Sequence, residues 1–124
     1  MTRYSKAEFY FAGCSTAQAR EFLSHRLRHL EGWTLIPTIG GWKGETEHAF
    51  KLEIIAPSDT PARYSTADIG VLVPAEVNSI ETEARDIAEA IAHQFNQEAV
   101  AYSVSPVALF ALTTVQATYR RNGG

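Results

Sequence analysis

Two pairs of neighbouring residues combine an aromatic ring with a cationic side chain. Trp42 and Lys43 lie in a glycine-rich stretch, and Arg63 and Tyr64 follow a proline-rich one, so both pairs are predicted to lie in loops. An aromatic face stacks on a flat group such as a nucleobase, and a lysine or arginine pairs with a phosphate. We therefore predict that these four residues contact a ligand that carries both groups. For Trp42 and Lys43, the alternative is a bulged hairpin that binds nothing.

Polar residues near two predicted boundaries could complete such a site. Asn96 and Gln97 follow a predicted helix, where their amides either hydrogen-bond a ligand or satisfy the free backbone groups of the helix end. Arg120 and Arg121 lie near the C-terminus. They either contact a phosphate that is bound at a neighbouring subunit or form a solvated tail.

Residues suited to catalysis are present, but their pattern does not favour it. Glu45, Glu47 and Glu53 share one face of an alternating segment, and His48 lies on the other. A general acid and a general base need two such groups in unlike environments, whereas three surface carboxylates explain the pattern equally well. Cys14 precedes a helix start, which can activate a thiol, but no histidine is tied to it by sequence, so a small buried cysteine is the favoured interpretation.

A metal site is not favoured either. His25 and His29 are four residues apart, a spacing at which two imidazoles on a helix can share an ion. The residue after the first histidine is Arg26, whose charge would repel a cation. We expect both histidines to be exposed near the helix C-terminus, and we expect neither a metal nor a cofactor.

Size and composition limit the classes of function. The chain has 124 residues, of which 45% are hydrophobic and 20% charged, and its net charge is −3. This predicts one domain over residues 1–124, with a core over about 6–115 and a frayed tail over 116–124. A negative net charge argues against binding to nucleic acid, which needs a basic surface.

The compartment follows from what the sequence lacks. No run of about 18 apolar residues exists, and the first residues lack the apolar segment of a signal peptide. With only one cysteine, the chain forms no internal disulfide. We expect a protein of the cytoplasm, that of the host if it is viral, with no membrane association.

The apolar residues recur with the periods of helices and strands. One stripe with helical spacing follows Asn78 and Ser79, either of which can cap the helix start, and contains Ile80, Ala84, Ile87, Ala88, Ile91, Ala92 and Phe95. A first helix begins at Ser15, which has capping-box spacing to Gln18, and stops at Gly32. Strands are predicted over residues 6–12, 33–39, 48–55 and 99–104, with a weaker one over 67–73 and a further one over 107–115 after a bend at Ser105-Pro106.

This order predicts an α+β fold. Strand, helix, strand, strand, helix, strand is the ferredoxin-like βαββαβ arrangement, an antiparallel sheet with two helices on one face, here with an extra C-terminal strand. The other face of the sheet needs cover wherever Phe9, Phe11, Ala49 or Ile55 point to it. A second copy of the chain would supply that cover, so we expect a homo-oligomer.

Two motifs carry a resemblance to known proteins. Gly41-Trp42-Lys43-Gly44-Glu45-Thr46-Glu47 and Phe95-Asn96-Gln97-Glu98-Ala99-Val100 resemble segments of small orphan proteins of phage and prophage origin, which are similar in layout to the ferredoxin-like signalling trimers of the PII and ACT type. The resemblance covers residues 6–104 in element order. It implies an oligomer that binds a small anionic metabolite or nucleotide between subunits, in a class that includes viral proteins that sequester immune signals. No functional residue is carried over from it.

The sequence thus predicts a non-catalytic, oligomeric binding protein for a small anionic, nucleotide-type ligand, which in a phage would sequester an immune signal. An inhibitor or adaptor that binds a host protein through an acidic face is the first alternative. A small hydrolase that uses Glu45, Glu47 or His48 is the second.

Overall fold

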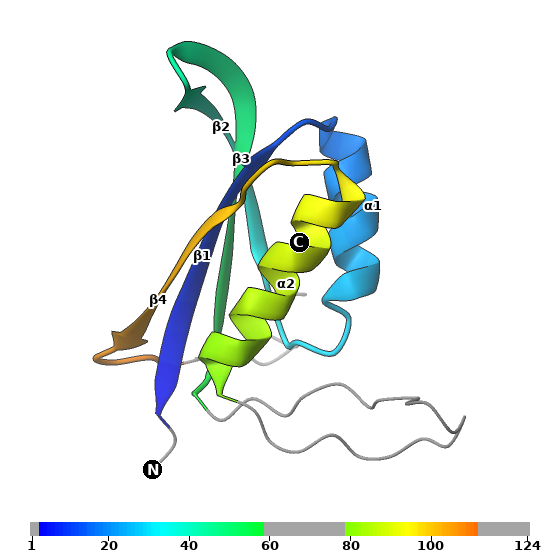
Figure 1. Ribbon diagram of the computed structural model, residues 1–124. Helices are drawn as coiled ribbons and strands as arrows, with labels where there is room; N and C mark the ends of the chain where they lie inside the picture. The colour runs from blue at the N-terminus through cyan, green and yellow to red at the C-terminus, as the bar shows by residue number, and fades with distance from the viewer. Residues whose placement is uncertain (1–2, 59–78, 112–124) are drawn as a thin grey trace, which may run out of the picture.

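The fold is a single antiparallel sheet with both helices on one of its faces (Figure 1). The structure is a computed structural model and describes residues 3–58 and 79–111. Its elements are β1 (Tyr4–Ala12), α1 (Thr16–Arg26), β2 (Thr34–Trp42), β3 (Glu45–Pro57), α2 (Ile80–Gln94) and β4 (Ala101–Val107). The strand order β2-β3-β1-β4 is that of a ferredoxin-like fold, which confirms the predicted fold class.

Two predicted strands lie wholly or partly outside the described residues. The weak strand over 67–73 lies outside the described residues, as do positions 112–115 of the predicted C-terminal strand; the described part of the latter forms no strand after Val107. Within the described chain, neither helix is long and apolar enough to cross a membrane.

Alternation along β1 and β3 builds the core. Ala7, Phe9 and Phe11 point to the helices, and their register partners on β3 are Ile54, Leu52 and Phe50. Phe9 and Phe11 therefore do not lie on the open face, where a partner subunit would have to cover them. Ala49 and Ile55 have the opposite parity and do face that way.

The helices bury the stripes that the sequence predicts. Ser15 caps α1 in a capping box with Gln18, and Ser79 caps α2 by accepting a hydrogen bond from the Thr82 amide. The core residues on α1 and its C-cap are Ala19, Leu23 and Leu27, and those on α2 are Ile80, Ala84, Ile87, Ala88 and Ile91. Packing of these stripes against β1 and β3 closes the core.

The β2–β3 connection is tighter than the sequence indicates. Lys43 and Gly44 form a two-residue turn with φ of 50° and 85°, the positive values that type I′ hairpins require. Pairing continues without a bulge from Thr34 opposite Glu53 to Trp42 opposite Glu45. Lys43 therefore lies in the connection as predicted, whereas Trp42 belongs to β2, and the bulge of the alternative is wrong. The reason is that Gly40 and Gly41 are accommodated inside β2, an edge strand.

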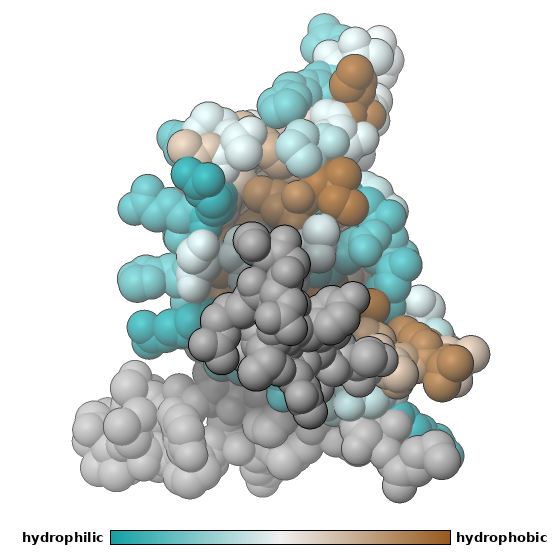
Figure 2. Space-filling model, turned by 180° about the vertical axis from the view of Figure 1, so that it is seen from behind, coloured by the Kyte–Doolittle hydropathy of each residue, from teal (hydrophilic) through white to brown (hydrophobic). Residues whose placement is uncertain are grey.

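The hairpin extends beyond the helices as an arm (Figure 1). Ile39, on the helix side of this arm, is 77% exposed, and Trp42 is 50% exposed. Seen from behind, the upper part of the molecule carries hydrophobic surface beside hydrophilic residues (Figure 2). The sequence pattern does not reveal this, because alternation predicts which face a residue takes but not whether a helix reaches far enough to cover it.

The last strand also differs from the prediction. β4 passes through Ser105 and Pro106, with Pro106 opposite Ser5, where the sequence predicts a bend. β4 is an edge strand, so its proline can turn the side that lacks an N–H away from the sheet.

The open face is held by paired charges at its centre. Lys51 Nζ lies 2.7 Å from Glu8 Oε2 and 3.0 Å from Glu53 Oε2, and Lys6 Nζ lies 3.8 Å from Glu8 Oε1. The hydrogen bond from Lys51 lowers the pKa of Glu8, and the two carboxylates raise the pKa of Lys51. The middle of this face is therefore compatible with water.

These shifts predict a pH-dependent contribution from Glu8. Because its pKa is lowered in the folded state, its carboxylate stabilises the fold above the pKa of the unfolded chain, and this contribution is lost as the pH falls through the folded value. We expect Glu8→Gln to lower the free energy of unfolding at pH 7 and to have a smaller effect at about pH 3, measured by urea denaturation. The control is Glu89→Gln, an exposed carboxylate on α2, which should have little effect at either pH. An equal loss for Glu8→Gln at both pH values would contradict the assignment.

Candidate functional site

Two cavities lie at opposite ends of β2. The smaller, about 280 Å³, lies beside the turn that follows Trp42, and the larger, about 440 Å³, lies where β2 begins at Thr34. The smaller cavity is the candidate site, because predicted ligand-binding residues meet there.

Three segments far apart in the sequence form the smaller cavity. They are the end of β1, the β2–β3 hairpin and the connection from α2 to β4. The residues that line it are Tyr10, Phe11, Ala12, Gly40, Gly41, Trp42, Glu47, Ala49, Gln97, Glu98, Ala99, Val100 and Ala101. Trp42 and Tyr10 are both about half exposed, so aromatic surface is accessible at this cavity.

Lys43 stands beside the cavity, but its charge is already paired. Its Nζ lies 3.0 and 3.1 Å from the two carboxylate oxygens of Glu98 and 5.6 Å from the centroid of the Trp42 ring. Both members of the ion pair are mostly exposed, Lys43 at 64% and Glu98 at 69%, so the bond is weak. The pair links the hairpin turn to the α2–β4 connection.

The side chain of Gln97 forms hydrogen bonds within the protein. Its Oε1 accepts a hydrogen bond from the Ala12 amide at 3.3 Å, and its Nε2 donates one to the Phe95 carbonyl at 3.3 Å. Gly13 has a φ of 84°, which favours glycine, and a side chain there would displace the Gln97 amide. Both polar atoms of Gln97 are thus engaged within the protein, and the alternative role, satisfying the helix end, is the one the contacts support.

The remaining predicted ligand-binding residues do not join this group. Asn96 is exposed, has a φ of 51° just after α2, and does not line the cavity. Arg63, Tyr64, Arg120 and Arg121 lie outside the described residues, and their roles stay predictions.

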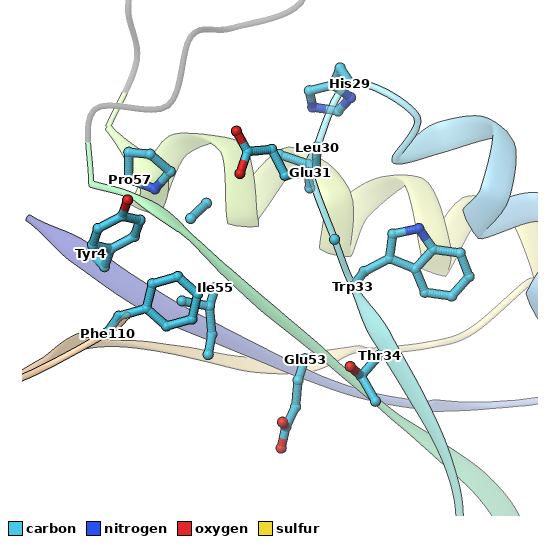
Figure 3. A pocket seen from close by; sticks show the side chains of 12 residues that line it. Tyr4, His29, Leu30, Glu31, Trp33, Thr34, Glu53, Ile55, Pro57 and Phe110 are labelled. Atoms are coloured by element: carbon cyan, nitrogen blue, oxygen red, sulfur yellow. The ribbon is translucent and has the colours of Figure 1, made fainter. Parts of the chain in front are cut away.

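The larger cavity exists because β3 extends beyond the first residue of β2. Thr34, the first residue of β2, pairs with Glu53, so Ile54 to Pro57 have β1 on one side and no β2 residue on the other. The α1–β2 connection and the residues after β4 complete the walls (Figure 3). Its lining residues are Tyr4, His29, Leu30, Glu31, Gly32, Trp33, Thr34, Glu53, Ile55, Ala56, Pro57 and Phe110.

His29, in the wall of the larger cavity, is tied to a buried carboxylate. Its Nε2 lies 2.8 Å from Oε1 of Glu83, whose side chain is 3% exposed. His29 as a whole residue is exposed, as expected, but its side chain is 22% exposed and is engaged by this carboxylate. A buried carboxylate requires a partner, and α1 ends at Arg26, which lets the following residues bring His29 to α2. Glu83 falls within the apolar stripe of α2, and this was the available sequence signal.

The other catalytic and metal candidates stay apart. Glu47 and Glu53 face the open side of β3, whereas the His48 ring packs edge-on against Phe50 at 5.1 Å on the opposite face. Burial raises the pKa of the Cys14 thiol, which favours the protonated form over the nucleophilic thiolate. Among the described residues, no three His, Cys, Asp or Glu side chains are placed to hold a metal.

Comparison with known proteins bears on the fold alone. No family model and no curated protein matches this chain. A solved structure, a DUF3240 family protein from Shewanella baltica OS155, is similar, with a TM-score of 0.54 and 12% sequence identity, covering 92% of this chain and all of that one. At this identity the similarity shows a shared arrangement of helices and strands and nothing about ligands.

The His29–Glu83 contact predicts an asymmetric effect of mutation. His29→Leu leaves the Glu83 carboxylate buried without this partner and should lower the free energy of unfolding by about 2 kcal/mol. Glu83→Leu leaves His29, which still reaches water, and should cost less. Urea denaturation of both variants measures the difference.

The double variant His29→Leu with Glu83→Leu is the matched control. Because it removes both polar groups, it should recover most of the loss and come within about 1 kcal/mol of the wild type. Additive losses in the double variant would show that the two side chains act independently.

Proposed function

We propose that this protein binds a small anionic, nucleotide-type ligand in the smaller cavity without transforming it. The observation that supports this most is the half-exposed indole of Trp42 at the cavity, with the Lys43 ammonium 5.6 Å from its ring centroid. A flat base can stack on the indole while a phosphate pairs with the ammonium, so two neighbouring residues offer both contacts.

The ligand must compete with Glu98 for Lys43. The ion pair is exposed, so it is weak enough for a phosphate, which carries more charge, to replace the carboxylate. Once displaced, Glu98 turns to solvent, and its repulsion of the phosphate limits the affinity. Glu98 therefore lowers the affinity of the site for anions, because it is paired with Lys43 before the ligand binds.

We further propose that the site is completed by a second copy of the chain. The smaller cavity has one flanking cation and the acids Glu47 and Glu98 in its described walls, which is too little positive charge for a nucleotide. In a homo-oligomer, Arg63, Tyr64, Arg120 or Arg121 of a neighbour would supply further aromatic and cationic contacts. In a phage, such a protein would sequester a nucleotide immune signal. A monomeric mass in sedimentation velocity would exclude a site shared between copies.

Calorimetry with a panel of nucleotides and cyclic dinucleotides tests the binding proposal. We expect one class to bind, Trp42→Leu to weaken it about tenfold and Trp42→Phe, which keeps a ring, to weaken it less. Lys43→Gln should weaken binding several-fold, whereas Glu98→Gln, which frees Lys43, should tighten it up to about fivefold. Weaker binding by Glu98→Gln would show that the ligand is not anionic at this position.

The fate of the ligand separates binding from catalysis. After incubation and heat denaturation of the protein, chromatography should recover the ligand intact; recovery of products would favour the hydrolase. No heat with any member of the panel, together with a purified protein that lacks a bound chromophore absorbing near 260 nm, would reject the proposal.

The projecting hairpin supports a second candidate, an inhibitor or adaptor of another protein. Ile39 is 77% exposed on the helix side of this arm, and Glu45 and Glu47 provide an acidic surface on its open side. Ile39→Ser should then abolish capture of a single stoichiometric partner from a host lysate and leave nucleotide binding unchanged. Capture that is unaffected by this substitution would reject the arm as the binding surface.

A further inference from the structure

The larger cavity combines aromatic walls with acidic groups. The rings of Tyr4 and Phe110 pack against each other with centroids 4.8 Å apart and an interplanar angle of 48°. Ile55 and Pro57 lie beside them in the wall (Figure 3). The cavity encloses about 440 Å³, enough for a small organic molecule with an apolar body.

The charges of its described walls are all negative. Glu31 and Glu53 line the cavity, and none of the described lining residues is lysine or arginine. Glu53 forms an ion pair with Lys51, whose Nζ lies 3.0 Å from Glu53 Oε2, so the charge of Glu53 is largely balanced. Glu31 forms no ion pair with any described residue, and its side chain extends in Figure 3 from the α1–β2 connection towards Pro57 and Tyr4.

His29 does not change this balance. Its Nε2 is held by Glu83 at 2.8 Å, so the imidazole shares whatever charge it carries with a buried carboxylate. The Trp33 ring points away from Tyr4 and Phe110 in Figure 3, and it packs against the core. The part of the cavity that can contact a ligand's charged group is therefore formed by Glu31 and the rings of Tyr4 and Phe110.

We propose that the larger cavity binds a small organic ammonium ion, with its cationic group between the Glu31 carboxylate and the faces of Tyr4 and Phe110. Aromatic faces attract cations through their quadrupole, and a carboxylate at the same end adds a direct ionic contact. The apolar body of the ligand lies on Ile55 and Pro57. An anion would be repelled by the Glu31 carboxylate here, so this site takes a different class of ligand from that of the Trp42 cavity.

Titration with choline and with 3,3-dimethyl-1-butanol tests the proposal. The second molecule replaces the quaternary nitrogen of choline by carbon and so keeps the shape while removing the charge. Followed by amide NMR shifts, choline should bind and perturb residues 29–34 and 53–57, and the neutral alcohol should bind at least fivefold more weakly. Equal affinities, or no perturbation by choline, would overturn the proposal.

Two matched pairs of variants locate the contacts. Glu31→Gln should weaken choline binding about fivefold, whereas Glu21→Gln, which removes an equal charge from an exposed position of α1, should leave it within twofold. Tyr4→Phe keeps the ring and should retain binding, and Tyr4→Leu should lose most of it. An unchanged affinity in Glu31→Gln, with the amide spectrum showing an intact fold, would refute the site.

Discussion

Pairing of β1 with β3 at the centre of the sheet is the constraint on which the rest of the structure depends. Its register places Phe9 opposite Leu52 and Phe11 opposite Phe50 on the side of the helices. A shift by one residue would turn these side chains to solvent and bring Glu8 and Lys51 into the core. The two helices can pack only where this apolar strip lies, so the register decides both the layer order and the direction in which the hairpin extends.

The same register determines where cavities form. At one end it ends with Ala12 opposite Ala49, two small side chains that leave room beside Trp42 and the α2–β4 connection. At the other end, β3 continues to Pro57 beyond the start of β2, which opens the larger cavity beside Tyr4. Both hollows thus arise from unequal strand lengths and side-chain sizes around one fixed central pair.

The side chains around the two cavities differ in charge. Paired charges at the centre of the open face separate a cavity with an aromatic ring beside a lysine from one with two aromatic rings and a carboxylate in its wall. The central network needs no partner to satisfy it. If the chain forms an oligomer, the cover is needed at the projecting arm, where Ile39 and Trp42 are exposed, and at Ile55, rather than over the middle of the sheet.

The sequence alone determined the element order, the cap at Ser15, and the face that each residue of β3 takes, because periodicity and capping are local properties of the chain. It limited the cap of the second helix to Asn78 or Ser79, and the structure shows Ser79 as the cap. It also identified Trp42 and Lys43 as neighbours suited to a ligand. Only the tertiary structure decided that Gln97 accepts a hydrogen bond from the Ala12 amide, that Glu98 forms an ion pair with Lys43, and that His29 contacts Glu83. Those contacts join positions 54 to 85 residues apart, and such distances are bridged by the packing of the sheet and helices, which no local pattern records.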